Sequence, residues 1–137
     1  MRITYLHQYY NNTTMNGGTR SYEFARRLVN RGHQVHVITS WRDGGKGKDW
    51  FETFDEGIHV HWLPIDYSNN MSFRVRLFAF LKFSFGAAKK AAGIDSDIVF
   101  ATSTPLTIAL PGAWAKFRLG VPLVFEVRDL WPELPIA

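Results

Sequence analysis

Two adjacent glycines, Gly17 and Gly18, follow a polar stretch and directly precede a segment with helical spacing. Glycine lets backbone N–H groups approach a ligand closely, and the first turn of a helix presents its positive dipole end at the same place. A phosphate group is the ligand that this combination favours. The sequence leaves open the alternative of a Gly–Gly turn that serves only strand-to-helix geometry.

Further polar residues stand where buried, strand-like segments end. His7 ends the first such segment, Ser103 and Thr104 close a later one, and Arg128 and Asp129 follow the last one. Ligands of parallel α/β sheets lie beyond the carboxyl ends of the strands. We therefore expect these side chains to form one rim together with the glycine pair.

Several kinds of site are excluded or disfavoured by the motifs. The sequence contains no G-x-G-x-x-G, no G-K-S/T and no cysteine, so a dinucleotide fingerprint, a P-loop and a thiolate metal site are absent. His59 and His61 lie two residues apart and face one side of a strand, but no third ligand stands near them in sequence. We predict that the protein uses no metal and no other cofactor.

The elements that must position the rim alternate between apolar strand-like segments and helical ones. We expect strands at residues 2–7, 34–40, 57–64, 97–103 and 122–127, and helices at 19–31, 71–93 and 105–120, with Gly32 ending the first helix and Pro111 bending or splitting the third. This alternation predicts an α/β fold, a Rossmann-like, mostly parallel sheet with flanking helices.

Composition indicates one globular domain, since the 137 residues are 46% apolar. The net charge is +4, yet residues 73–90 alone carry five basic residues and no acid. Nucleic-acid binders more often spread their cations along a groove, so no nucleic-acid partner is predicted. The N-terminus lacks the pattern of a signal peptide, which predicts a cytoplasmic protein.

The basic segment combines cations with aromatic residues. On a helical wheel, one apolar face is expected to pack on the sheet: Phe73, Leu77, Phe80, Leu81, Ser84, Ala88 and Ala91. The other surface suits an anionic membrane, with peripheral contact by Arg74, Arg76, Phe78, Lys82, Phe83, Phe85 and Lys89. Cations interrupt the segment too often for a membrane span. An ordinary buried helix, whose extra aromatic residues meet neighbouring elements, remains the alternative.

Two stretches carry a resemblance to a known family. The stretch NGGTRSYEFARRLVNRGHQVHVITS, residues 16–40, resembles the opening of family 4 glycosyltransferases of the GT-B fold. Residues 102–135, which include RDLWPE, are similar to one subgroup, the WbuB-like and WcaI-like enzymes that build bacterial surface polysaccharides. The resemblance runs the length of the chain.

The resemblance implies a two-domain enzyme of which residues 1–137 form an incomplete N-terminal, acceptor-side domain, without the C-terminal domain that binds most of the donor. The whole enzyme would be a retaining hexosyltransferase. It would move a sugar from a nucleotide-sugar substrate to a saccharide or polyprenyl-linked acceptor, in polysaccharide or lipopolysaccharide biosynthesis at the inner membrane face. This domain alone is expected to be inactive.

Residue by residue, the resemblance places the substrate at the rim. The expected substrate-binding residues are Gly17, Gly18, Arg20, His7, Ser103 and Thr104, and the expected catalytic residues are Asp129, Arg128 and Glu133. Arg128 stands where many family members have histidine, and an arginine stays charged at neutral pH, which argues against a proton relay there. A structural Arg128–Asp129 pair remains open, as does a non-catalytic module that binds a membrane or a partner protein.

Overall fold

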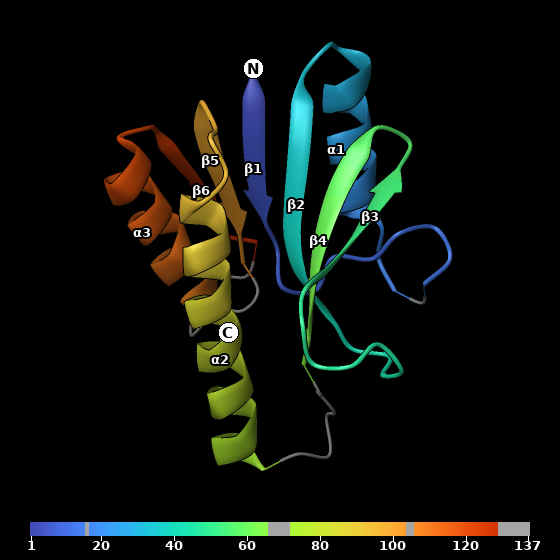
Figure 1. Ribbon diagram of the computed structural model, residues 1–137, viewed down its shortest axis with the longest axis vertical. Helices are drawn as coiled ribbons and strands as arrows, with labels where there is room; N and C mark the ends of the chain where they lie inside the picture. Colours follow the sequence, from blue (N-terminus) through green and yellow to red (C-terminus); the bar gives the residue numbers. More distant parts are fainter. Residues whose placement is uncertain (16, 66–71, 104–105, 129–137) are drawn as a thin grey trace, which may run out of the picture.

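The computed structural model in Figure 1 describes residues 1–15, 17–65, 72–103 and 106–128. Its centre is a six-stranded sheet made of β1 (Arg2–Leu6), β2 (Gln34–Trp41), β3 (Phe51–Asp55), β4 (Ile58–Pro64), β5 (Ile98–Thr102) and β6 (Leu123–Glu126). The strand order is β3-β4-β2-β1-β5-β6, and every neighbouring pair is parallel except β3 and β4. The predicted α/β fold with a mostly parallel sheet is confirmed.

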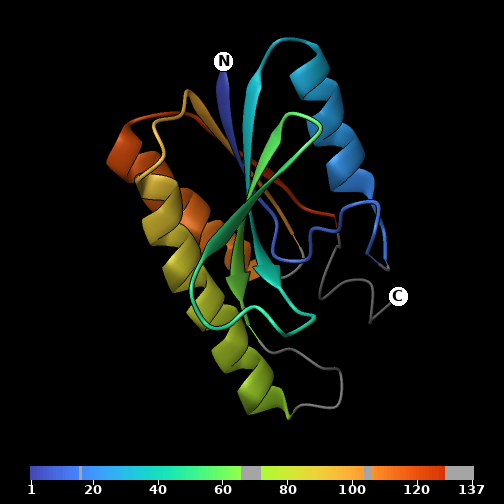
Figure 2. The ribbon, with the colours of Figure 1, turned by 45° about the vertical axis from the view of Figure 1, so that its right-hand side comes forward.

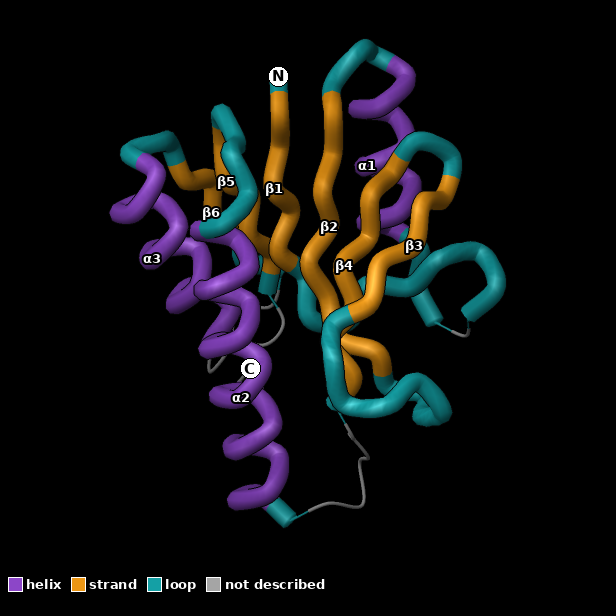
Figure 3. Tube along the Cα trace, in the orientation of Figure 1, coloured by secondary structure: helices purple, strands orange, loops and turns teal. Residues whose placement is uncertain are grey.

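Helices cover both faces of the sheet (Figures 2 and 3). Helix α1 (Arg20–Asn30) lies on one face, and α2 (Phe73–Ala92) and α3 (Ala109–Leu119) lie on the other. Neighbouring residues of β1 point to opposite faces, so Tyr5 joins the apolar cluster under α1 while Leu6 joins the one under α2 and α3. The two clusters hold the carboxyl ends of β1, β5 and β6 near the start of α1.

Strand β3 was not among the strands expected from the sequence. It forms a hairpin with β4 through Glu56 and Gly57, whose φ angles of 49° and 86° are both positive. Two positive φ angles in a two-residue loop are the geometry that suits the twist of a β-hairpin. The signal was present, since a glycine divides two stretches of alternating apolar and polar residues.

Pro111 does not bend or split a helix over 105–120, so that expectation is wrong. A single 3-10 turn spans Leu106–Ile108, and the α-helix begins at Ala109. Pro111 therefore lies in the first turn of α3, where a backbone N–H has no partner within the helix and its loss is tolerated.

The packing face of α2 agrees with the expected one only in part, at Ser84 and Ala91. The residues that α2 buries are Ala79, Phe83, Ser84, Ala87 and Ala91, whereas Phe73, Leu77 and Leu81 are 72%, 40% and 43% exposed. Small residues allow a close approach: a Cβ on Gly86 would lie 2.8 Å from the Leu63 Cδ2.

Phe83 is wholly buried, so its expected membrane contact is wrong. Phe78 and Phe85 are exposed, as are Arg74, Lys82 and Lys89, while Arg76 is half-buried. No described helix is long and apolar enough to cross a membrane.

Candidate active site

Four chain segments converge at the carboxyl edge of the sheet. His7 directly follows β1, Thr102 and Glu126 are the last residues of β5 and β6, and Arg20 opens α1. Residues far apart in sequence are thereby bonded to one another, as the rule for parallel sheets predicts. We call this set the rim, together with Gly17, Gly18, Ser21, Ser103 and Arg128.

An ion pair joins α1 to β6. Arg20 donates two hydrogen bonds to Glu126, from Nη1 to Oε1 at 2.7 Å and from Nη2 to Oε2 at 2.6 Å. Thr102 Oγ1 also donates to Oε1 at 2.7 Å. The bond from Arg20, followed by that from Thr102, lowers the pKa of Glu126 to about 2 against the opposing effect of burial. Glu126 is therefore a carboxylate at neutral pH and acts only as an acceptor.

His7 connects α1 to the end of β6 through its two ring nitrogens. Nε2 lies 3.3 Å from Arg128 Nη1, and Nδ1 lies 2.8 Å from Ser21 Oγ. A guanidinium can only donate, so Nε2 accepts and the ring proton sits on Nδ1, from which it is donated to Ser21. The Arg128 backbone N–H donates to Ser103 Oγ at 2.8 Å, which fixes the main chain beside the imidazole.

The protonation of His7 follows from its surroundings. Burial, and then the positive charge of Arg128, lowers the pKa of His7 to about 3. The imidazole is therefore neutral at pH 7 and too weak a base to suit proton abstraction at that pH. In this arrangement it holds Arg128 in place rather than moving a proton.

Local backbone geometry requires a glycine at residue 17 of the loop but not at residue 18. Gly17 has φ +121°, and a Cβ there would lie 2.5 Å from Asn11 Nδ2, so local geometry alone demands glycine. A Cβ on Gly18 would meet no atom of the described residues within 4 Å. The turn interpretation thus accounts for Gly17 but leaves Gly18 beside open space.

The loop is held by a short relay of side chains. Arg42 Nη2 donates to Asn11 Oδ1 at 2.7 Å, and Asn11 Nδ2 donates to the Gly18 carbonyl at 3.2 Å. Arg42 is anchored in turn by the carbonyls of Gln8, Ser40 and Tyr10. The relay fixes the orientation of the Gly18–Thr19 peptide, directly after the Gly18 N–H, before any ligand arrives.

Of the predicted site residues, the structure brings His7, Arg20, Ser103 and Arg128 together in one bonded group. Thr104, Asp129 and Glu133 lie outside the described residues. Sequence reasoning missed Glu126, Ser21 and Thr102 as rim residues. Glu126 carried a usable signal, because it is the acidic residue at the end of an otherwise apolar strand.

A small hollow adjoins the ion pair on the α1 face. It has a volume of about 230 Å³ and is lined by Tyr5, Arg20, Glu23, Phe24, Arg27, Phe100 and Glu126. Three aromatic rings form its floor, with centroids 5.0–5.7 Å apart. Arg20 and Glu126 belong both to this hollow and to the rim. A ligand at the rim therefore has an apolar surface beside it.

A group of histidines lies away from the rim, on β2 and β4. His36 Nδ1 is 3.0 Å from His61 Nε2, and the His36 and His59 rings stack with centroids 4.6 Å apart. Burial lowers the pKa of His61 to about 4. Among the described residues, no group of three or more histidine or acidic side chains has the geometry of a metal site.

Comparison with known proteins gives the family. The sequence matches the model of the Glycosyl transferase 4-like domain over residues 17–137, beginning at the first glycine of the rim. Together with the fold, this defines the class as a glycosyltransferase domain with a Rossmann-like α/β fold. The chain belongs to the Glycosyl transferase 4-like family. No curated protein matches the sequence.

Solved structures support the fold. Two structures of the C-terminal domain of the PF1911 hydrogenase from Pyrococcus furiosus superpose with TM-scores of 0.63 and 0.64, at 16% identity over 91% of this chain and 90% of theirs. A trehalose-6-phosphate protein from E. coli, solved with bound UDP-2-fluoro glucose, gives a TM-score of 0.62 at 10% identity. This last match covers 91% of the present chain and 32% of that one.

Proposed function

We propose that this domain is the acceptor-side half of a retaining glycosyltransferase of the WbuB-like and WcaI-like subgroup, which uses a nucleotide sugar as donor. Transfer forms a bond from an acceptor hydroxyl oxygen to the anomeric carbon and breaks the bond from that carbon to a diphosphate oxygen, which takes up the hydroxyl proton as it leaves. Negative charge grows on the departing diphosphate. A second Rossmann-like half would hold most of the donor.

The observation that supports this proposal most is that the loop of Gly18, before α1, and the held side chain of Arg128, after β6, both belong to the carboxyl edge of the sheet. The open space beside Gly18 lets a phosphate oxygen approach its backbone, and neutral His7 together with Ser103 positions the Arg128 guanidinium. Donors fixed in advance stabilise developing charge without reorganisation, by a few kcal/mol for each donor. In this mechanism Arg128 binds charge and moves no proton.

The acceptor is proposed to be a saccharide on a polyprenyl carrier, used in bacterial surface polysaccharide or lipopolysaccharide synthesis at the inner membrane face. The first turns of α2 extend past the carboxyl edge of the sheet (Figure 1), and they carry Arg74, Phe78 and the half-buried Arg76. A cytoplasmic enzyme docked on the membrane by α2 would present its rim near a lipid-linked acceptor.

Release of nucleoside diphosphate tests the proposal. The full-length protein is incubated with a panel of nucleotide sugars and a polyprenyl-diphosphate saccharide, and the stereochemistry of the new bond is read by NMR. We expect turnover with retention for one donor, and none for residues 1–137 alone. No turnover across the panel would contradict the proposal.

The competing function is a non-catalytic module that binds a membrane or a partner protein. It predicts vesicle binding that survives Gly18→Val and Arg128→Ala, with no donor turned over. A transferase predicts that the same two substitutions leave vesicle binding intact but remove turnover, so the two functions are separated by one pair of variants.

A further inference from the structure

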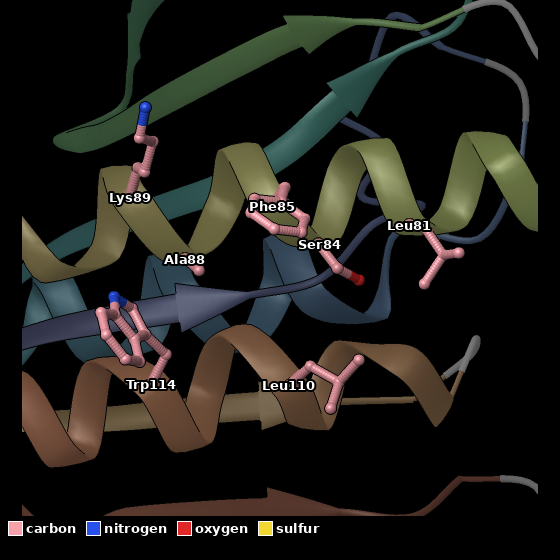
Figure 4. Close-up of a pocket in the computed structure, with 7 residues that line it drawn as sticks. All are labelled: Leu81, Ser84, Phe85, Ala88, Lys89, Leu110 and Trp114. Carbon is pink, nitrogen blue, oxygen red and sulfur yellow. The ribbon is translucent and has the colours of Figure 1, made fainter.

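An apolar groove runs between α2 and α3 on the outer side of the molecule (Figure 4). Its volume is about 500 Å³, within the range of sites that bind small molecules. The residues that line it are Leu81, Ser84, Phe85, Ala88, Lys89, Leu110 and Trp114. Lys89 lies at the same end of the groove as Trp114, and Leu81 and Leu110 lie at the other end.

The interior of the groove offers almost nothing to a polar ligand. Its one neutral polar side chain, Ser84, is buried and already donates to the Thr107 carbonyl at 3.2 Å. The walls are nevertheless open to solvent, with Phe85 78%, Leu110 57% and Trp114 46% exposed. Contiguous exposed apolar surface of this kind marks a binding site more often than isolated apolar residues do.

The charge around the groove identifies the kind of occupant. Helices α2 and α3 together carry seven cations and no acid: Arg74, Arg76, Lys82, Lys89, Lys90, Lys116 and Arg118. The whole chain carries +4, so with +7 on these two helices the remainder carries −3. The positive charge of the protein is thus concentrated on the two helices that form the groove. Lys89 lines the apolar groove itself, and Arg118 lies 5.9 Å from the centre of the Trp114 ring in its wall, so the groove is complementary to an anionic lipid.

We propose that the α2–α3 groove takes one hydrocarbon chain of an anionic phospholipid, whose headgroup pairs with Lys89. A flexible chain is thin enough to lie along the line where the two helices meet. This binding goes beyond the membrane contact proposed above for the outer surface of α2, and it does not depend on sugar transfer.

Quenching of Trp114 by brominated lipid tests the proposal. The protein is mixed with vesicles of phosphatidylglycerol whose acyl chains carry bromine, and with matched vesicles of phosphatidylcholine. Because the chain has five tryptophans, Trp114→Phe identifies the part of the signal that comes from the groove. We expect quenching with the anionic vesicles that is at least threefold stronger than with the neutral ones, and that Trp114→Phe removes.

Two pairs of variants distinguish a chain in the groove from a flat surface contact. Ala88→Phe fills the groove, whereas Phe54→Ser removes a 65% exposed ring from β3, which does not line it. Lys89→Ala removes the proposed headgroup partner, and Lys82→Ala removes a cation that does not line the groove. Circular dichroism spectra check that all four variants fold.

The expected result is that Ala88→Phe and Lys89→Ala each weaken the quenching of Trp114 at least threefold, while Phe54→Ser and Lys82→Ala change it less than twofold. Undiminished quenching in Ala88→Phe would overturn the proposal and leave an interfacial surface without a chain site. Absence of quenching in the folded wild-type protein would overturn it as well and would favour a protein partner on this face.

Discussion

Substitution of Gly18 separates the two explanations of the glycine pair. In Gly18→Val the new side chain occupies the space that a phosphate would use, and Gly17→Ala changes only the neighbouring residue. The structure predicts different outcomes, because in the described part of the chain a Cβ on Gly18 meets no atom within 4 Å, while one on Gly17 lies 2.5 Å from Asn11 Nδ2.

The magnitudes follow from these environments. Gly18 carries no positive φ, so an L-residue fits there and the free energy of unfolding should change by less than about 1 kcal/mol. Turnover should fall about 10²- to 10³-fold, the usual loss when one preorganised donor is removed. At Gly17 the φ of +121° lies in a region that strains other residues by about 1–3 kcal/mol, so Gly17→Ala should lose stability as well as turnover.

Both quantities are measured on the full-length enzyme, stability by urea denaturation and turnover by release of nucleoside diphosphate at saturating acceptor. We expect Gly18→Val to lower turnover but not stability, and Gly17→Ala to lower both. Equal losses of stability and turnover in Gly18→Val would return Gly18 to a purely structural role. Unchanged turnover would remove it from the site.

Three further predictions concern the rim and its supports. Glu126→Gln should lower the free energy of unfolding at pH 7 by about 1 kcal/mol, more than Glu23→Gln on the surface of α1. Folding lowers the pKa of Glu126 from 4.5 to about 2, so the stabilisation by its ion pair is present above pH 4.5 and is lost as the pH falls toward 2. Urea titrations that show no difference between the two variants at pH 7 would refute the ion pair. The pKa of His7 is lowered from 6.5 to about 3, so the unfolded state takes up a proton before the folded state does. As the pH falls through this window, His7 therefore lowers the free energy of unfolding by up to about 1.4 kcal/mol per pH unit. His7→Gln should flatten this slope in urea titrations between pH 7 and 4, and an unchanged slope would contradict the burial of His7. Asn11→Ala should free the Gly18–Thr19 peptide, loosen the loop of Gly18 and lower kcat about tenfold, with little change in KM for the acceptor. Asn12→Ala, which loses only the hydrogen bonds that Thr14 donates to its side chain, should keep wild-type kinetics. Equal kinetics of the two variants would count against the relay.

The layered fold could be predicted from the sequence because the patterns that specify its strands and helices are local. Buried β-branched runs and a helical period decide which segments become strands and helices, and Gly32, with φ 91°, ends α1 as predicted. The face that α2 buries was not predictable in this way. Two faces of that helix are apolar, and the face that contains the alanines packs on the sheet, because small residues let the helix approach the sheet closely.

The rim was predicted in outline, from the ends of parallel strands, but its partners were not. Arg20 and Glu126 are 106 residues apart, and only the strand order β1-β5-β6 brings the end of β6 to the start of α1. The neutral state of His7 likewise depends on tertiary burial beside Arg128. The catalytic roles predicted for Asp129 and Glu133 remain predictions, as does the subgroup within the family.

A crystal structure of the full-length enzyme with its nucleoside diphosphate tests the central claim most directly. The account predicts phosphate oxygens within about 2.7–3.2 Å of the Gly18 backbone N–H and of the Arg128 guanidinium, with His7 still donating to Ser21. A diphosphate bound away from this edge, with Gly18 covered by the protein's own side chains, would contradict it.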